Sequence, residues 1–160
     1  MSPVLAYKVF ISHCTADSVR VEQLRALFSA AGIQAYVCSN DVQPGRQLSE
    51  KLQREIQSSN AVLVIYTSAA SSSAYVQQEI GFALRCKKLV VPFVDEASAD
   101  NVDLAMLAGI EQVRFDPADP LPAITKLLER FKKERLEQQV WATVLLALMA
   151  AGLFYVAAQA

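Results

Sequence analysis

The chain has 160 residues, of which 53% are hydrophobic and 19% are charged, enough apolar residues for one folded domain and an additional apolar segment. Its 15 basic and 16 acidic side chains leave a net charge of −1, so we expect no binding to nucleic acid. The three cysteines, Cys14, Cys38 and Cys86, form no C-x-x-C pair, and there is a single histidine. These features argue against a disulfide framework and against a metal site.

Short apolar runs bounded by Ser, Asn, Gly or Pro predict strands. They lie at Tyr7–Ile11, Ile33–Val37, Ala61–Tyr66 and Leu89–Val94, with a weaker fifth run at Gln112–Phe115. Helical periodicity predicts helices over Val19–Ala31, Leu48–Ile56 and Ala74–Arg85, and a final helix from Leu121. Because strands and helices alternate, we expect an α/β fold. It would be a flavodoxin-like open parallel sheet of order 2-1-3-4-5, with helices on both faces and its core within residues 1–120.

The C-terminal segment is the most apolar part of the sequence. Nineteen residues from Val140 to Ala158 carry no charge, and as a helix they would extend roughly 30 Å, close to the thickness of a bilayer core. We therefore expect a transmembrane helix at 140–160, preceded by an amphipathic juxtamembrane helix at 121–139. Basic residues outnumber acidic ones before the span, which predicts a single-pass protein of the cell inner membrane, with a cytoplasmic domain and a C-terminus on the far side. The alternative is a helix buried in an oligomeric core or a partner groove.

Parallel sheets bind ligands beyond the carboxyl ends of their strands, which directs attention to four segments: Ser12–Asp17, Cys38–Gly45, Thr67–Ser73 and the chain from Asp95 onward. The chain lacks the G-x-S-x-G, Walker A and G-x-G-x-x-G motifs of serine hydrolases, phosphate-loop NTPases and Rossmann dehydrogenases. His13 and Cys14 are adjacent and should point in divergent directions, which disfavours a Cys-His nucleophile pair. Tyr75 and Glu79 are four residues apart, so the third predicted helix presents an aromatic ring and a carboxylate on one face.

Four segments in sequence order resemble the motifs of TIR (Toll/interleukin-1 receptor) domains. Lys8–Asp17 is similar to the opening strand of the family with its F-I-S-H sequence and following Asp, and Asp41–Gly45 resembles the BB loop after the second strand. Ser71–Glu79 is similar to the S-x-W-V-x-x-E-I segment, and Leu89–Val94 matches the proline-containing fourth strand. Together these motifs identify a bacterial-type TIR domain, and the resemblance covers Ala6 to Asp95.

The resemblance implies that Glu79 occupies the position of the glutamate with which TIR enzymes break the nicotinamide–ribose bond of NAD+. The leaving group of NAD+ is already a cationic pyridinium, so one carboxylate can suffice without a general acid. NAD+ is then the substrate, and no cofactor is expected. The resemblance assigns substrate binding to six residues: Ser12, His13, Cys38, Asp41, Arg46 and Tyr75, the last of which stands where the family usually has tryptophan. Pro44 and Gly45 are turn-forming residues of the segment assigned to self-association.

Two functions from different classes follow from the resemblance. The first is a membrane-tethered NAD+ glycohydrolase that acts in immune defence, is activated by self-association and releases linear or cyclic ADP-ribose-like products. The second is a non-catalytic adaptor that signals through TIR–TIR contacts, in which Glu79 has a structural role. In both cases the expected partners are other copies of the chain, further TIR or sensor proteins, and membrane lipid through residues 140–160.

Overall fold

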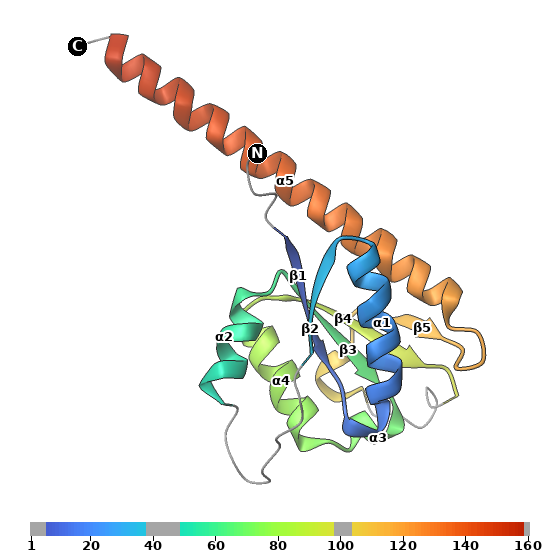
Figure 1. Cartoon of the computed structure of the whole chain (residues 1–160). Helices are drawn as coiled ribbons and strands as arrows, with labels where there is room; N and C mark the ends of the chain where they lie inside the picture. The colour runs from blue at the N-terminus through green and yellow to red at the C-terminus, as the bar shows by residue number, and fades with distance from the viewer. Residues whose placement is uncertain (1–5, 38–48, 98–103, 159–160) are drawn as a thin grey trace. The chain divides into compact units, whose positions relative to one another are not determined.

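The computed structural model describes residues 6–37, 49–97 and 104–158, and the side chains of the last helix as far as Met149. Its centre is a five-stranded parallel sheet in the order β2-β1-β3-β4-β5 (Figure 1). The strands are β1 (Tyr7–Ser12), β2 (Ile33–Val37), β3 (Ala61–Tyr66), β4 (Leu89–Asp95) and β5 (Val113–Phe115). The predicted fold class and strand order are therefore confirmed.

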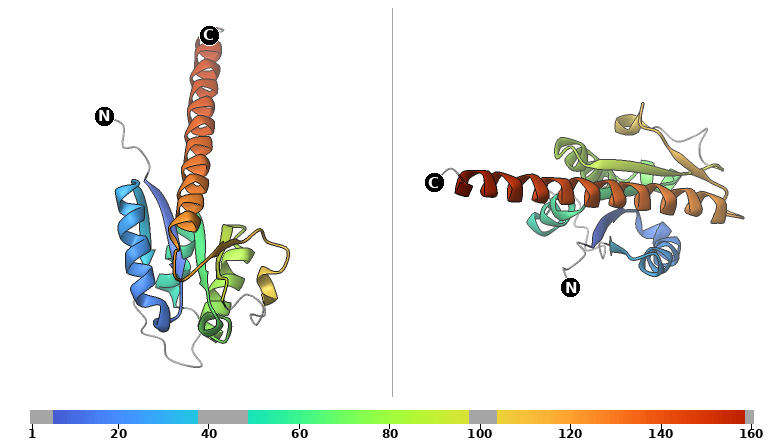
Figure 2. Two further views of the ribbon diagram at one scale, coloured as in Figure 1. Left: turned by 90° about the vertical axis from the view of Figure 1, so that its right-hand side faces the viewer. Right: turned by 90° about the horizontal axis from the view of Figure 1, so that it is seen from above.

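Helices connect the strands on both faces of the sheet. They are α1 (Ser18–Ala30), α2 (Glu50–Ser58), α3 (Ser68–Ser71), α4 (Ala74–Arg85) and α5 (Leu121–Ala158), with short 3-10 turns η1 (Thr15–Asp17) and η3 (Ala105–Leu107). α1 lies on one face and α2 and α4 lie on the other, as Figure 1 shows and the view from above in Figure 2 agrees. Gly32 follows α1 with a φ of 73°, a conformation that favours glycine and allows the chain to turn into β2.

The core is built around β3, in which all six residues are buried. A strand covered on both faces needs apolar side chains in both directions, which explains its near-continuous apolar sequence. On the side of α2 and α4, one hydrophobic cluster joins Phe10, Val64 and Tyr66 of the sheet with Ile56 and Ile80 of the helices. This packing fixes α4 against the middle of the sheet.

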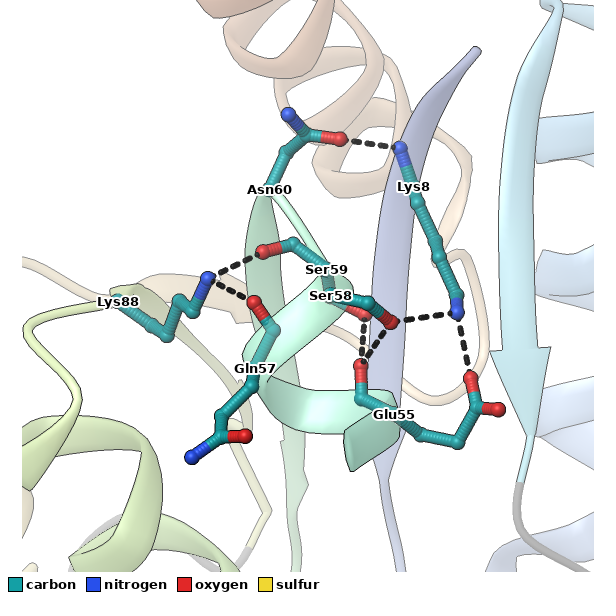
Figure 3. A network of polar contacts seen from close by, with 7 residues as sticks. All are labelled: Lys8, Glu55, Gln57, Ser58, Ser59, Asn60 and Lys88. Carbon is teal, nitrogen blue, oxygen red and sulfur yellow. Dashed lines mark hydrogen bonds and ion pairs between the residues drawn. The ribbon is translucent and has the colours of Figure 1, made fainter. Parts of the chain in front are cut away.

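A polar network closes the amino-terminal edge of the sheet (Figure 3). The backbone amide of Lys8 in β1 donates to Asn60 Oδ1 over 2.7 Å, and the Lys8 ammonium binds the Glu55 carboxylate and Ser58 Oγ. Lys88 reaches from the turn before β4 and donates to the carbonyl of Ser59 over 2.9 Å. These contacts hold the starts of β1, β3 and β4 together. The candidate site lies at the opposite edge, where the strands end.

The last helix, α5, runs without a break from Leu121 to Ala158. Two compact units are distinguished, one spanning Met1–Lys126 and the other Leu127–Ala160, and each is described by itself. In the second unit, Arg130 pairs with Glu134 over 3.0 Å and Lys133 with Glu137 over 3.9 Å, and both pairs have the i, i+4 spacing of helical ion pairs.

The predicted transmembrane helix at 140–160 is not supported. Among the described residues, none of the helices combines the length and the apolarity that crossing a membrane requires. Residues 150–160 of the predicted span lie outside the residues whose side chains are described.

Candidate functional site

The carboxyl ends of β1 and β3 meet at the point where the strand order reverses. β1 lies between β2 and β3, and Ser12, its last residue, pairs with Val64 of β3. The chain leaves these two neighbouring strands in opposite directions, which is where open parallel sheets bind their ligands. The loops after β1 and β3 and the start of α4 all lie at this edge.

Glu79 is the most deeply buried acid that the structure describes at this edge. The buried residues of α4 are Val76, Glu79, Ile80 and Ala83, spaced three and four apart along one helical face. Glu79 thus belongs to the apolar stripe that packs on the sheet, and its exposed fraction is only 1%. Ser73 caps the helix by accepting from the Val76 amide, which fixes where the stripe begins.

The two carboxyl oxygens of Glu79 differ in their surroundings. The Ser12 hydroxyl donates to Glu79 Oε2 from the end of β1. Oε1 is also buried, and it has no hydrogen-bond partner among the described residues. A buried acceptor without a partner costs free energy, on the order of 1–3 kcal/mol. Such an atom marks a place where a ligand group can supply the missing hydrogen bond.

Burial raises the pKa of Glu79 to about 8, since removing the carboxylate from water disfavours its charged form. Hydrogen bonds from the Ser12 and Tyr75 side chains oppose this shift and lower the pKa. In the ligand-free domain the carboxyl is therefore mostly protonated at neutral pH. A positive charge placed beside it would favour ionisation.

Tyr75 and Glu79 share one face of α4, as their spacing predicts, and the side chain of Tyr75 is close enough to Glu79 to lower the pKa of its carboxyl. Tyr75 is half-buried and packs against the hydrophobic cluster between α4 and the sheet. The structure thus brings together three of the residues to which the sequence assigns a role: Ser12, Tyr75 and Glu79.

His13 and Cys14 do not form a pair. The His13 ring is buried, its Nδ1 lies 3.5 Å from the Ile11 carbonyl oxygen, and burial lowers its pKa, which favours the neutral imidazole. The Cys14 thiol instead donates to Asp17 Oδ2 over 3.1 Å. Burial raises the pKa of Cys14, so the thiol stays protonated and is a poor nucleophile.

Asp17 is the residue of this edge whose role the sequence did not reveal. Its buried carboxylate accepts from Thr67 Oγ1 over 2.9 Å and binds Arg20 over 3.0 Å, in addition to the Cys14 thiol. One side chain therefore ties the loop after β1 to the end of β3 and to α1. An acid shortly after an F-I-S-H strand was the available sequence signal, but spacing alone does not tell which groups converge on it.

A pocket of about 430 Å³ lies beside Asp17. Its lining comes from α1, from the ends of β3 and β4 and from the start of α5, and it includes Arg20, Thr67, Phe93 and Asp95. Glu79 is not among the lining residues. This pocket is therefore separate from the surroundings of the Glu79 carboxyl.

The remaining assigned residues lie outside the described part of the chain. These are Cys38, Asp41 and Arg46, predicted to bind substrate, and Pro44 and Gly45, predicted to take part in self-association. Their roles stay predictions. Groups of three or more residues able to hold a metal ion do not occur within the described ranges.

Comparison with known proteins places these observations in a family. The model of the TIR domain family matches residues 9–128, three quarters of the sequence. The chain therefore belongs to the TIR domain family. The match extends past Asp95, where the sequence motifs end, and takes in β5 and the start of α5. The comparison with curated proteins gives no match.

Solved structures agree with this assignment at the level of the fold. The TIR domains of the activated Roq1 resistosome, which directly recognises the pathogen effector XopQ, superpose with a TM-score of 0.60 at 17% identity, covering 78% of this chain and 98% of that one. The TIR domain of the Toll-related receptor TRR-2 from Hydra magnipapillata gives 0.60 at 18% identity, covering 76% and 94%. A diflavin flavoprotein from Nostoc sp. gives 0.51 at 13% identity, covering 82% and 97%. None of these likenesses supports the prediction of a bacterial-type member.

Replacing Glu79 with Gln is expected to stabilise the fold above neutral pH. The unfolded carboxyl releases its proton near pH 4.5, whereas the folded one retains it until about 8, so the stability that protonated Glu79 contributes is lost as the pH rises through this window. The amide of Glu79→Gln stays neutral throughout. At about 1.4 kcal/mol per pKa unit, the difference should reach roughly 3–5 kcal/mol by pH 8.5 and be small at pH 5. Urea unfolding of both chains measures it, and parallel pH dependences would contradict the raised pKa.

Proposed function

We propose that this TIR domain hydrolyses the nicotinamide–ribose bond of NAD+, with Glu79 as the catalytic carboxylate. The observation that carries the proposal is the state of that side chain: it is buried, it is held by Ser12 on one oxygen, and its other oxygen lacks a partner among the described residues. It also lies at the edge of the sheet where this fold binds ligands.

The proposed reaction breaks the bond between the anomeric carbon of ribose and the pyridinium nitrogen. The bonding electron pair moves to that nitrogen, nicotinamide leaves as a neutral molecule, and positive charge develops on the ribose. An ionised Glu79 stabilises this charge, and its Oε1 accepts a hydrogen bond from a ribose hydroxyl. A water molecule then adds at the anomeric carbon and loses a proton, which gives ADP-ribose; attack by a group of the same molecule would give a cyclic product.

The raised pKa of Glu79 fits this chemistry when the charge of the substrate is considered. The free domain holds the carboxyl neutral, which avoids an isolated buried charge. The cationic pyridinium of bound NAD+ favours the ionised form, so the carboxylate develops where the substrate is present. Tyr75 offers a partly buried ring beside it for stacking on the nicotinamide. His13, Cys38, Asp41 and Arg46 complete the proposed substrate-binding set.

Activation by self-association is part of the proposal. One solved likeness is to TIR domains within an activated resistosome, and that assembly supports association as the active state of such domains. Pro44 and Gly45 are the residues proposed to take part. Local concentration would then control turnover, because weak contacts form readily between clustered copies.

A second function, that of a non-catalytic adaptor, is favoured by one observation. A protonated glutamic acid that is 1% exposed and bound to a serine hydroxyl can also serve as a purely structural buried group. In an adaptor the chain would signal through TIR contacts alone. The two functions differ in whether Glu79 is needed for turnover.

In the unsubstituted chain, kcat/KM for NAD+ hydrolysis should rise with pH and level off near pH 8, because the free domain must ionise Glu79. Nicotinamide release measures this pH dependence.

In the clustered full chain, Glu79→Gln is expected to lower the rate of NAD+ hydrolysis at least about 100-fold, the usual scale for losing one preorganised electrostatic contact in a transition state. Nicotinamide release measures this rate as well. Glu50→Gln is the matched control, since that side chain is 91% exposed on α2. Equal rates in all three chains would remove Glu79 from catalysis, and no turnover in any of them would favour the adaptor.

Attachment to the inner membrane, with the TIR domain in the cytoplasm, is a further part of the proposal. It is supported by exposed apolar side chains of α5, which include Val140 (54%), Trp141 (72%), Leu145 (58%) and Leu148 (65%). Transfer of such side chains from water into lipid is favourable, and tryptophan is enriched at the interface between lipid and water.

The double substitution Leu145→Lys and Leu148→Lys is expected to move the full chain from the membrane fraction to the supernatant, because charged groups resist entry into hydrocarbon. Sedimentation with anionic lipid vesicles measures the change. The control is Leu136→Lys, a similarly exposed leucine of α5 that precedes the apolar stretch. Membrane attachment is wrong if the unsubstituted chain stays in the supernatant. The proposed role of the two leucines is wrong if the double variant sediments with the vesicles to the same extent as the unsubstituted chain.

A further inference from the structure

Ser12 has a hydroxyl that is already engaged. The residue is fully buried, and its Oγ donates to Oε2 of Glu79 across 67 residues of sequence. A serine hydroxyl has one O–H donor, so while Ser12 donates to Glu79 it cannot also donate to a sugar. The contact therefore differs from the substrate-binding role that the sequence resemblance assigns to Ser12.

The backbone around Ser12 is fixed from two directions. Ser12 lies within the paired part of β1, in register with Val64 of the buried strand β3. Five residues later, Asp17 ties the following loop to Thr67 at the end of β3 over 2.9 Å. The hydroxyl is thus presented from a rigid strand, the support that a preorganised site requires.

From this geometry we infer that Ser12 is a positioning residue for Glu79: its hydroxyl holds Oε2 and leaves Oε1 as the acceptor for a ribose hydroxyl of the substrate. This inference rests on the proposed function and refines it by giving the two carboxyl oxygens different tasks. Without Ser12 the carboxyl could rotate about its last side-chain bond, and neither oxygen would have a fixed direction. Such a rotation would move the acceptor oxygen away from the ribose hydroxyl, and misplacing a catalytic group by about 1 Å can lower turnover about 100-fold.

The pKa of Glu79 supplies a readout that is independent of catalysis. Among the described residues, the influences on that pKa are burial and the hydrogen bonds from Ser12 and Tyr75. The Ser12 hydrogen bond stabilises the ionised form and lowers the pKa, so its removal should raise the titration midpoint of the Glu79 carboxyl. A serine that contacted only substrate would leave this midpoint unchanged.

The test compares Ser12→Ala with the unsubstituted full chain. Carboxyl carbon NMR of the chain labelled at glutamate gives the midpoint of Glu79, and Glu79→Gln identifies its signal. We expect Ser12→Ala to raise the midpoint by about one pH unit and to lower kcat about tenfold with little change in KM. Ser12→Thr keeps a hydroxyl and should restore both values toward those of the unsubstituted chain. Tyr75→Phe should give a smaller upward shift, since Tyr75 contributes less.

Ser59→Ala is the matched control. Ser59 follows the last residue of α2, is 2% exposed, and its hydroxyl donates to the Glu55 carbonyl over 2.7 Å near the opposite edge of the sheet. It should cost similar stability and leave both the midpoint and kcat unchanged. An unshifted midpoint in Ser12→Ala would overturn the inference, and so would a raised KM with kcat unchanged. If the midpoint shifts while the clustered unsubstituted chain releases no nicotinamide, the proposed function fails and the hold of Ser12 on Glu79 stands.

Discussion

The burial of one carboxyl group at the centre of an apolar helix face is the constraint on which the site depends. α4 packs on the sheet through Val76, Ile80 and Ala83, and Glu79 occupies the same face. A solvated glutamate at this position would require the helix to turn its apolar side chains to water. The domain instead buries the acid, gives it a hydroxyl partner from β1 and keeps it mostly protonated. The cost is the one expected of functional positions, where local rules of stability are broken.

The two edges of the sheet differ in how completely their polar groups are hydrogen-bonded. At the amino-terminal edge, Lys8 and Asn60 join β1 to β3, and their partners are found within the domain. At the carboxyl-terminal edge, Asp17 satisfies three donors, whereas Oε1 of Glu79 is left without a partner among the described residues. The strand order points to this second edge, since open parallel sheets bind their ligands where the strand order reverses. A ligand bound there would contact the end of strand β1 and could donate a hydrogen bond to Oε1 of Glu79.

Much of the fold could be predicted from the sequence, because the buried strands are short and nearly all apolar. β3 was predicted with the bounds that it has, and so was α4, since both have strong periodic signals and polar residues at each end. The transmembrane helix predicted from the uncharged sequence after Gln139 is not supported, since none of the helices in the described part of the chain is long and apolar enough to cross a membrane. Glu79 was found through motif resemblance. Its burial had a visible cause as well, an acid spaced like a core residue between Val76 and Ala83. The convergence on Asp17 and the engagement of Ser12 depend on contacts across about 50 and 67 residues, which no local pattern reveals.

If Glu79 acts as proposed, its buried carboxyl receives the ribose of a nicotinamide dinucleotide. The most direct measurement is the titration midpoint of that carboxyl in the clustered chain, with and without a non-hydrolysable analogue of NAD+ that keeps the cationic pyridinium. We expect the analogue to lower the midpoint from about 8 to below neutral pH, because the pyridinium charge stabilises the carboxylate. A midpoint that stays near 8 in a chain saturated with the analogue would contradict it.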